Sequence, residues 1–410
     1  MWLPNPTVTI NGQDYTGVSV NEVSIRRGRD TVYQQANAGV ATVELIDVGT
    51  LTRFDVGSDL EVSMLFPAIE WELLADSWGG LGETWNRAFG PLAPGFIEPV
   101  FTGTVSDWQA DAVATGDQPV MRYRVTGIGP LATLNRRNIF FDGRIAENDG
   151  ERVEAVLTAA LGTAVVDPTI IDEGVFDLAA LDAQESGYGA LSVLRDAAQS
   201  SEGVFFETRD GKIGYGDSDR RFTTTEFIPV PFGSVEVGGL SVSSQLADVT
   251  NVVTVEYSDG AVTVSDADSI DTFGEQDATL RTSLATEAQA QTFAELYLPR
   301  HSAPAINLGR LGLNLRNMDP DLRVALLEAN TNDGILLTGI PRRVGGFRNF
   351  EGFIEGVELT FSQVEARIGL LVSDAVLSTG DMRWTVVPPT IIWDEVEPPT
   401  LTWDNARTIA

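Results

Sequence analysis

Alternation of apolar and polar residues constrains the fold of this chain more than any other feature. It runs through residues 18–25, 43–45 and 60–64, and returns at 100–105 and 121–125. A period of two places one face of each strand on a core and the other on solvent or a partner. Further strand patterns occupy much of residues 240–264 and 306–361. We therefore predict a mainly β chain with two strand-rich regions.

The segment between these regions changes to a helical pattern. Asn148 and Glu151 have the spacing of a capping box, and apolar residues at helical spacing follow as far as Gly162. A second helix is predicted to begin after Ser186. The sequence thus predicts a small α+β module inserted between the strands.

A hairpin and a third helix are predicted downstream. Asp210-Gly211 would supply a two-residue turn, which would pair Phe206 with Tyr215 across the hairpin. Thr286 is a helix-capping residue, and Pro299 is expected to stop the helix that Thr286 begins.

These patterns divide the chain into four predicted segments. Residues 1–140 would form a first strand-rich domain, for which a small barrel or sandwich fits, and it carries a Trp-, Gly- and Pro-rich insertion at 67–99. Residues 141–235 would form the α+β module, and residues 236–375 a second strand-rich domain. The polar, proline-rich residues 376–410 are predicted to be an extended docking segment.

Most tryptophans lie in the insertion and the tail, outside the predicted barrels. Tryptophan offers a large contact area and is common at binding hot spots, so these residues are candidates for binding a partner. The alternative is that each one anchors a loop onto its own barrel. The candidates are Trp71, Trp78, Trp85, Trp384, Trp393 and Trp403.

Residues that commonly carry catalysis near neutral pH are scarce. The chain has no cysteine, a single histidine (His301) and a single lysine (Lys212). Asp266, Asp268 and Asp271 have metal-like spacing, but the glycine and final glutamate of a calcium loop are missing. We therefore expect no catalytic residue, cofactor or metal site, and a structural protein in place of an enzyme.

The charge of the chain bears on its partners. Asp and Glu number 59 against 27 Lys and Arg, which gives a formal net charge of −32. Such a surface repels nucleic acid, and an acidic wall would let DNA pass without sticking. The simpler interpretation is that the acidic residues keep the protein soluble. No apolar run approaches bilayer length and the start of the chain lacks a signal-peptide pattern, so synthesis and folding in a cytoplasm are expected.

The order of certain segments resembles the baseplate-hub and minor tail proteins of long-tailed, siphovirus-type bacteriophages, particularly those of actinobacterial hosts. The resemblance spans about residues 5–375 and leaves out the insertion and the tail. The segments that carry it are RRGR at 26–29, QQANAG at 34–39, ATVEL at 41–45, FTGTVSDW at 101–108, GIGPLATL at 127–134, VLRDAA at 193–198, GVFF at 203–206, ADVTNVV at 247–253, DSIDTFG at 268–274 and GFIEG at 352–356.

The resemblance implies a homotrimer in which two tail-tube-like β-barrel hub domains per subunit, residues 1–140 and 236–375, form a pseudo-sixfold ring. Such a ring would join the sixfold tail tube to threefold tip components and leave a channel for DNA. The implied partners are a distal tail or tail-tube protein, the tape-measure protein and other minor tail or tip proteins. The implied location is the tail tip of a virion.

Two other functions stay open at this point. The chain could be a receptor-binding adhesin whose insertion and tail touch the host surface. It could also be a tail-associated cell-wall hydrolase, because carboxylate pairs are abundant in so acidic a sequence.

Overall fold

The computed structural model of the chain describes residues 6–15, 19–31, 34–47, 54–66, 96–114, 120–163, 166–224, 226–244, 246–304, 307–342, 348–362 and 365–375. Strands predominate among these residues, which confirms the mainly β class. The N-terminal strands are β1 (Pro6–Ile10), β2 (Gln13–Asp14), β3 (Ser19–Gly28), β4 (Asn37–Asp47), β5 (Asp59–Phe66), β6 (Phe96–Ala114) and β7 (Val120–Ile128). Their C-terminal counterparts are β15 (Phe227–Pro231), β16 (Val235–Ser243), β20 (Asn307–Asn314), β21 (Gly334–Thr338), β22 (Phe350–Ser362) and β23 (Ala366–Asp374).

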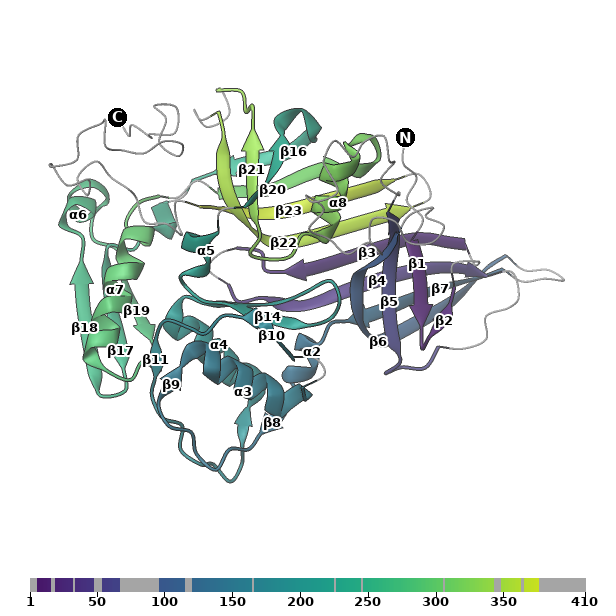
Figure 1. The fold of residues 1–410 in the computed structure, drawn as a ribbon. Coiled ribbons are helices and arrows are strands. Elements are labelled where there is room, and N and C mark those ends of the chain that lie inside the picture. The colour runs from purple at the N-terminus through teal and green to yellow at the C-terminus, as the bar shows by residue number, and fades with distance from the viewer. Residues whose placement is uncertain are drawn as a thin grey trace, which may run out of the picture.

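All of these strands belong to one sheet, which is mostly antiparallel. Its order is β16-β20-β23-β22-β3-β4-β7-β6-β5-β1-β2, with β21 paired to β22 and β15 paired to β21. The join between the two ends of the sequence is the pairing of β22 with β3, which runs from Gly356 opposite Gly28 to Ser362 opposite Glu22. Figure 1 shows this join as yellow strands lying beside purple ones.

The two barrels predicted from the sequence are not seen as separate closed barrels among the described residues. The reason is the pairing between β22 and β3, which uses the strand edges through which two separate barrels would otherwise close. Periodicity indicates which residues form strands, but it cannot show that strands more than 300 residues apart become neighbours.

A second group of elements lies against this sheet, in the lower and left parts of Figure 1. The central segment supplies α2 (Leu131–Leu134), β8 (Asn138–Ile139), β9 (Glu147–Asn148), α3 (Asp149–Leu161), β10 (Val166–Ile171), β11 (Asp177–Leu178), β12 (Tyr188–Gly189), α4 (Ala190–Ser201), β13 (Val204–Glu207), β14 (Ile213–Gly216) and α5 (Arg220–Thr223). Later in the chain come β17 (Val252–Tyr257), β18 (Gly260–Ser265), α6 (Ala267–Phe273), β19 (Asp277–Arg281) and α7 (Glu287–His301). Helix α8 (Pro320–Glu328) instead packs on the large sheet, and its Leu326 and Leu327 belong to the core of that sheet. Short 3-10 turns lie at Phe232–Ser234, Leu246–Asp248 and Leu315–Asn317.

The described apolar residues form two cores. One fills the large sheet, from Val8 to Val372. The other is shared by α3, α4 and the β13–β14 hairpin with β17 and α7, which contribute Val253, Val255 and Phe293. Residues from two distant parts of the sequence therefore complete one core, and the four predicted segment boundaries stay a prediction.

The helical predictions hold, with one correction. Helix α3 begins at Asp149 and ends before Gly162, and the side chain of Glu151 accepts a hydrogen bond from the Asn148 N–H at 3.4 Å. Helix α7 runs two residues past Pro299, which was predicted to stop it. Because Pro299 lies in the last turn, its missing N–H removes only one backbone bond near the end of the helix.

The predicted hairpin forms, but its register differs by one residue. Tyr215 lies opposite Phe205, whereas the sequence predicted Phe206. The connection is a three-residue loop closed by a 2.9 Å hydrogen bond from the Thr208 N–H to the Lys212 carbonyl, with Gly211 at a φ of 79°. A three-residue loop with glycine in the left-handed region is a common hairpin connection, and its extra residue shifts the pairing.

No helix in the described part of the chain has both the length and the apolar character that crossing a bilayer requires.

Candidate functional site

The six tryptophans that the sequence singles out as partner-binding candidates all lie outside the described residues. They are Trp71, Trp78, Trp85, Trp384, Trp393 and Trp403. Their role therefore stays a prediction. Trp108, on β6, is described, and its ring packs edge-on against Phe54 with centroids 6.2 Å apart, which is a contact within the sheet core.

The aspartates with metal-like spacing form the start of a helix. Asp266 caps α6, where its carboxylate accepts a hydrogen bond from the Ser269 N–H at 3.1 Å. Asp268 and Asp271 lie exposed on that helix. Across the described ranges, no group of three or more His, Asp or Glu side chains is placed to hold a metal ion.

His301 joins two helices. Its ring stacks on Tyr297 at a centroid distance of 3.9 Å, and its Nε2 lies 3.2 Å from Oε1 of Glu202 at the end of α4. Arg300 binds the same carboxylate. Burial would raise the pKa of Glu202, but His301 and Arg300 together lower it. The arrangement favours a structural role for His301.

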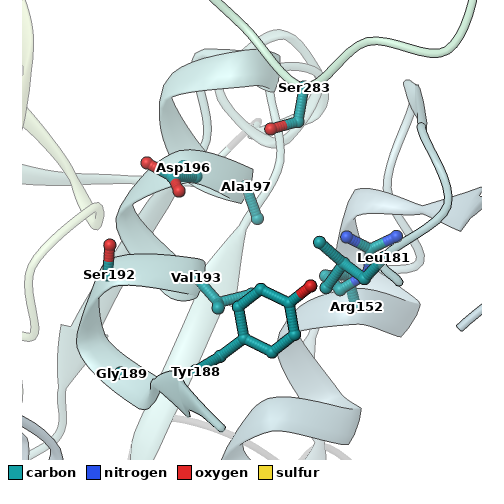
Figure 2. Close-up of a pocket in the computed structure, with 9 residues that line it drawn as sticks. All are labelled: Arg152, Leu181, Tyr188, Gly189, Ser192, Val193, Asp196, Ala197 and Ser283. Atoms are coloured by element: carbon teal, nitrogen blue, oxygen red, sulfur yellow. The ribbon is translucent and has the colours of Figure 1, made fainter. Parts of the chain in front are cut away.

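A small cavity lies between α4 and the segment that contains Leu181 (Figure 2). Its volume is about 90 Å³, room for about three water molecules and below the ~300 Å³ of common ligand pockets. The guanidinium of Arg152, which borders it, already binds the carboxylate of Glu147 and the carbonyl of Ala179. The cavity therefore offers little to a ligand.

Buried charge gathers where the join between β3 and β22 meets the α+β module. We call this group the junction, and it comprises Arg27, Arg29, Glu207, Arg221 and Glu355. The first two come from β3 and the residue after it, Glu207 ends β13, Arg221 lies on α5, and Glu355 lies on β22. All five are less than a tenth exposed.

Glu355 is the centre of the junction. Its carboxylate lies 2.5 Å from Nε of Arg29 and 2.8 Å from Nη2 of Arg221, and the hydroxyl of Ser373 donates a third hydrogen bond. Burial alone would raise the pKa of Glu355, but Arg221 and Arg29 outweigh that effect and lower it to about 2. The carboxylate is therefore ionised, and it pairs with Arg29, which follows β3, and with Arg221 on α5.

Arg221 links the module to the sheet. Besides Glu355, its guanidinium donates to Oδ1 of Asn332 at 2.7 Å and lies 5.0 Å from the centre of the Phe353 ring. Burial lowers the pKa of Arg221, although the neighbouring Glu355 opposes this. A planar guanidinium that forms several such contacts at once fixes the orientation of α5 on β22.

Glu207 occupies a second carboxylate site of the junction. The backbone N–H groups of Gly39 and Leu131 each donate to it at 2.6 Å. Burial raises the pKa of Glu207 to about 7, although these N–H groups and Arg27 act in the opposite direction. A Cβ atom at Gly129 would overlap the carboxylate, so a side chain there would displace Glu207 from its two N–H donors.

Asn330 and Arg209 extend the junction along the module. The Asn330 side chain accepts hydrogen bonds at 3.2 Å from both Arg27 Nη1 and the Arg209 N–H. Arg209, in the hairpin loop, also binds Glu98 on β6 at 2.9 Å. Polar contacts therefore attach the β13–β14 hairpin to β6 and, through Asn330, to β3.

The sequence analysis did not single out these residues as a site. Arg27, Arg29 and Glu355 lie inside segments that carry the phage resemblance, but they were not assigned a role. The signal that could have revealed them is polarity within strands: Glu355 interrupts the otherwise apolar run from Phe353 to Val357. An ionised residue at an apolar position needs a buried partner, but the sequence does not identify it.

The junction offers structural support and no evident chemistry. Its carboxylates are occupied by guanidinium, hydroxyl and backbone N–H donors, and its side chains are buried. Groups held in this way fix the relative positions of strands and helices, and they present no free nucleophile or base to a substrate.

The fold formed around this junction is shared with bacteriophage tail proteins. The 43 kDa tail protein of prophage MuSo2 from Shewanella oneidensis is 12% identical to this chain, with a TM-score of 0.58. The match covers 92% of this chain and 99% of that one. A tail protein from Neisseria meningitidis MC58 is 11% identical, with a TM-score of 0.60, and the match covers 93% and 99% of the two chains.

Comparison by sequence gives no match, in contrast to comparison by structure. No protein-family model matches the chain, and no curated protein matches it. At 11–12% identity the likeness concerns the fold alone.

Proposed function

We propose that this chain is a structural subunit of a bacteriophage tail or baseplate. The observation that carries the proposal is the likeness of fold over nearly the whole of both chains, 99% of each tail protein and more than nine-tenths of this one. A shared fold alone does not fix a function, but here the buried charge is also committed to holding elements together. A structural role accounts for both observations, and catalysis is not needed to explain either.

Within this class, the proposed role is a homotrimeric hub at the tail tip. Residues 1–140 and 236–375 would supply the two hub domains of each subunit, and three copies would close a ring by head-to-tail contacts. The ring would join the sixfold tail tube to threefold tip components, contact the tape-measure protein and surround a DNA channel. The net charge of −32 supports a lumen that DNA passes without binding.

The same proposal gives the tryptophan-rich regions a role in attachment. The insertion at 67–99 and the tail at 376–410 would contact neighbouring tip proteins. A siphovirus-type phage of an actinobacterial host is the source that the sequence resemblance favours, and the two structural relatives do not bear on that point.

The mass of the purified chain in solution tests the hub. Light scattering coupled to size exclusion should give three times the 44.2 kDa of one chain. A variant that lacks residues 67–95 is the control, since a hub should still form its trimer without them. A monomer that forms no ring on purified tail tubes in electron micrographs would contradict the hub role.

Host binding separates the hub from an adhesin. If the chain were an adhesin, the variant lacking residues 67–95 would lose binding to host cells while keeping its fold. A hub predicts that purified chain with or without the insertion binds host cells equally weakly, and that neither digests cell walls.

A further inference from the structure

A groove on the module side of the sheet differs in charge from the rest of the chain. It has a volume of about 670 Å³ and lies between α2, the start of β4, the end of β7 and α4. Three of its lining residues are arginines and none is acidic, although the whole chain has more than twice as many acidic as basic residues. The arginines are Arg136, Arg137 and Arg195.

These arginines are available to a partner. Their side chains are exposed, and none of them forms an ion pair with another described residue. By contrast, Arg29, Arg152 and Arg221 are committed to buried carboxylates. Three unpaired guanidinium groups at one groove favour an anionic occupant.

The floor of the groove is apolar. By floor we mean the buried and half-buried residues of the lining, which are Ala36, Ala38, Ile128, Leu131, Ala132 and Leu191. Val40, the next outward-facing residue of β4 after Ala38, is 39% exposed. A groove with an apolar floor and a cationic rim fits a short segment that carries both a large apolar side chain and carboxylates.

Two segments outside the described residues combine a tryptophan with three carboxylates and apolar neighbours. One is residues 69–76, in which Trp71 follows Phe66 by five residues that span at most about 18 Å. Phe66 lies seven residues, or about 23 Å, along β5 from Asp59, the end of the strand that pairs through Thr104 with Ile128 at the groove, so this segment falls short.

The other segment has a longer reach. Residues 391–397 read Ile-Ile-Trp-Asp-Glu-Val-Glu, with three carboxylates beside Trp393 and proline pairs on both sides in the sequence. We propose that this segment of the same chain docks in the groove, with Trp393 on the apolar floor and Asp394, Glu395 and Glu397 facing the three arginines.

The path from the end of β23 to the groove is short enough. Leu371 lies opposite Gly356, Gly356 opposite Gly28, and Gly28 opposite Asn37 at the groove edge. Three strand spacings amount to about 14 Å, and the four residues from Leu371 to Ala375 add about 13 Å. The 18 residues from Ala375 to Trp393 can extend to about 60 Å, so the segment can reach the groove of its own chain.

Docking of the Trp393 segment would divide the tail into two parts, and this deepens the proposed attachment role. The Trp393 segment would hold the tail on its own subunit, and the following Trp403 segment would stay available to a tip protein. The chain itself supplies the matched control, because Trp403 is followed by one carboxylate (Asp404) and then by Arg407.

Site-specific photo-crosslinking in the full chain tests the docking. Benzoylphenylalanine in place of Trp393 should crosslink to peptides that contain Arg136, Arg137 or Arg195, whereas the same replacement at Trp403 or Trp71 should not. In an equal mixture of ¹⁴N- and ¹⁵N-labelled chains, the crosslinked peptides should carry the same label. Crosslinks between different labels, elsewhere on the chain, or from Trp71 to the groove would overturn the proposal.

Charge changes provide the second measurement. The variant Arg136→Glu, Arg137→Glu, Arg195→Glu and the variant Asp394→Asn, Glu395→Gln, Glu397→Gln should each lower the crosslink yield by about tenfold. Hydrogen exchange of the peptide 131–137 should become faster in the second variant, whose substitutions lie outside both described cores. An unchanged yield and unchanged exchange would refute the docking, whatever the oligomeric state proves to be.

Discussion

Replacing Glu355 by glutamine should remove a large part of the stability of the chain. Glutamine keeps the shape of the side chain and can still accept a hydrogen bond from Ser373, but it removes the negative charge. Arg29 and Arg221, which are buried against Glu355 at 2.5 Å and 2.8 Å, then lack their counter-charge. Breaking a buried ion pair by removing one partner costs about 3–5 kcal/mol.

The pKa of Glu355 gives an independent figure. It is lowered from 4.5 to about 2, which corresponds to about 3 kcal/mol in favour of the ionised form, at about 1.4 kcal/mol per pKa unit. Because the folded-state pKa is below the unfolded one, this stability is present above pH 4.5. It is lost as the pH falls from 4.5 toward 2, and the variant should lack this acid-dependent loss.

Urea unfolding at pH 7 and pH 3 measures both effects. Glu358→Gln is the control, because Glu358 lies three residues further along β22, is 31% exposed and pairs with Arg26 and Arg310. A surface pair of this kind contributes about 0–1 kcal/mol. If Glu355→Gln cost no more than Glu358→Gln at pH 7, or if its cost were the same at pH 3, the reasoning would be refuted.

Three further predictions concern the junction and the module. The pKa of Glu207 is raised from 4.5 to about 7, so its contribution to the free energy of unfolding is present below pH 4.5 and lost as the pH rises through 7. Urea unfolding from pH 5 to 8 should show this loss of stability in the wild type and less of it in Glu207→Gln. Gly129→Ala should destabilise by about 2–4 kcal/mol, because the new Cβ displaces the Glu207 carboxylate from its backbone donors, whereas Gly233→Ala, with nothing within 4 Å of the added Cβ, should have little effect in the same assay. Tyr215→Phe should cost about 1–3 kcal/mol in thermal unfolding, because its hydroxyl donates to buried Asp149 at 2.5 Å, and a cost near zero would contradict that role.

Local sequence signals predicted local structure well. The capping residues of α3 and α7 and the alternation in β3 to β7 correspond to observed elements. Their physical basis is short-range: a side chain caps an N–H three residues away, and a period of two follows from the pleat of one strand. The register error in the β13–β14 hairpin arose where two loop lengths fit the same Asp210-Gly211 pair.

Pairings across long sequence distances could not be predicted in this way. Val357 on β22 lies opposite Arg27 on β3, and Val253 joins the core that α3 and α4 begin. No local pattern states which edge of a strand meets which partner. The junction depends on the same long-range pairings, so its charged residues stood out in the sequence only as unusual residues within strands.

The junction also explains how the parts of the chain fit together. The sheet combines strands from the N-terminal and C-terminal parts of the sequence, and the module comes from the part between them. The β3–β22 pairing brings Arg29 and Glu355 together, and Arg221 reaches the same carboxylate from the module. This three-residue contact therefore forms only when β3, β22 and the module are all in place at once. A contact with that requirement couples the orientation of the module to closure of the sheet, because misplacing either part leaves a buried charge unpaired. Such coupling suits a subunit that must keep one shape within a larger assembly, which is the role we propose for this chain.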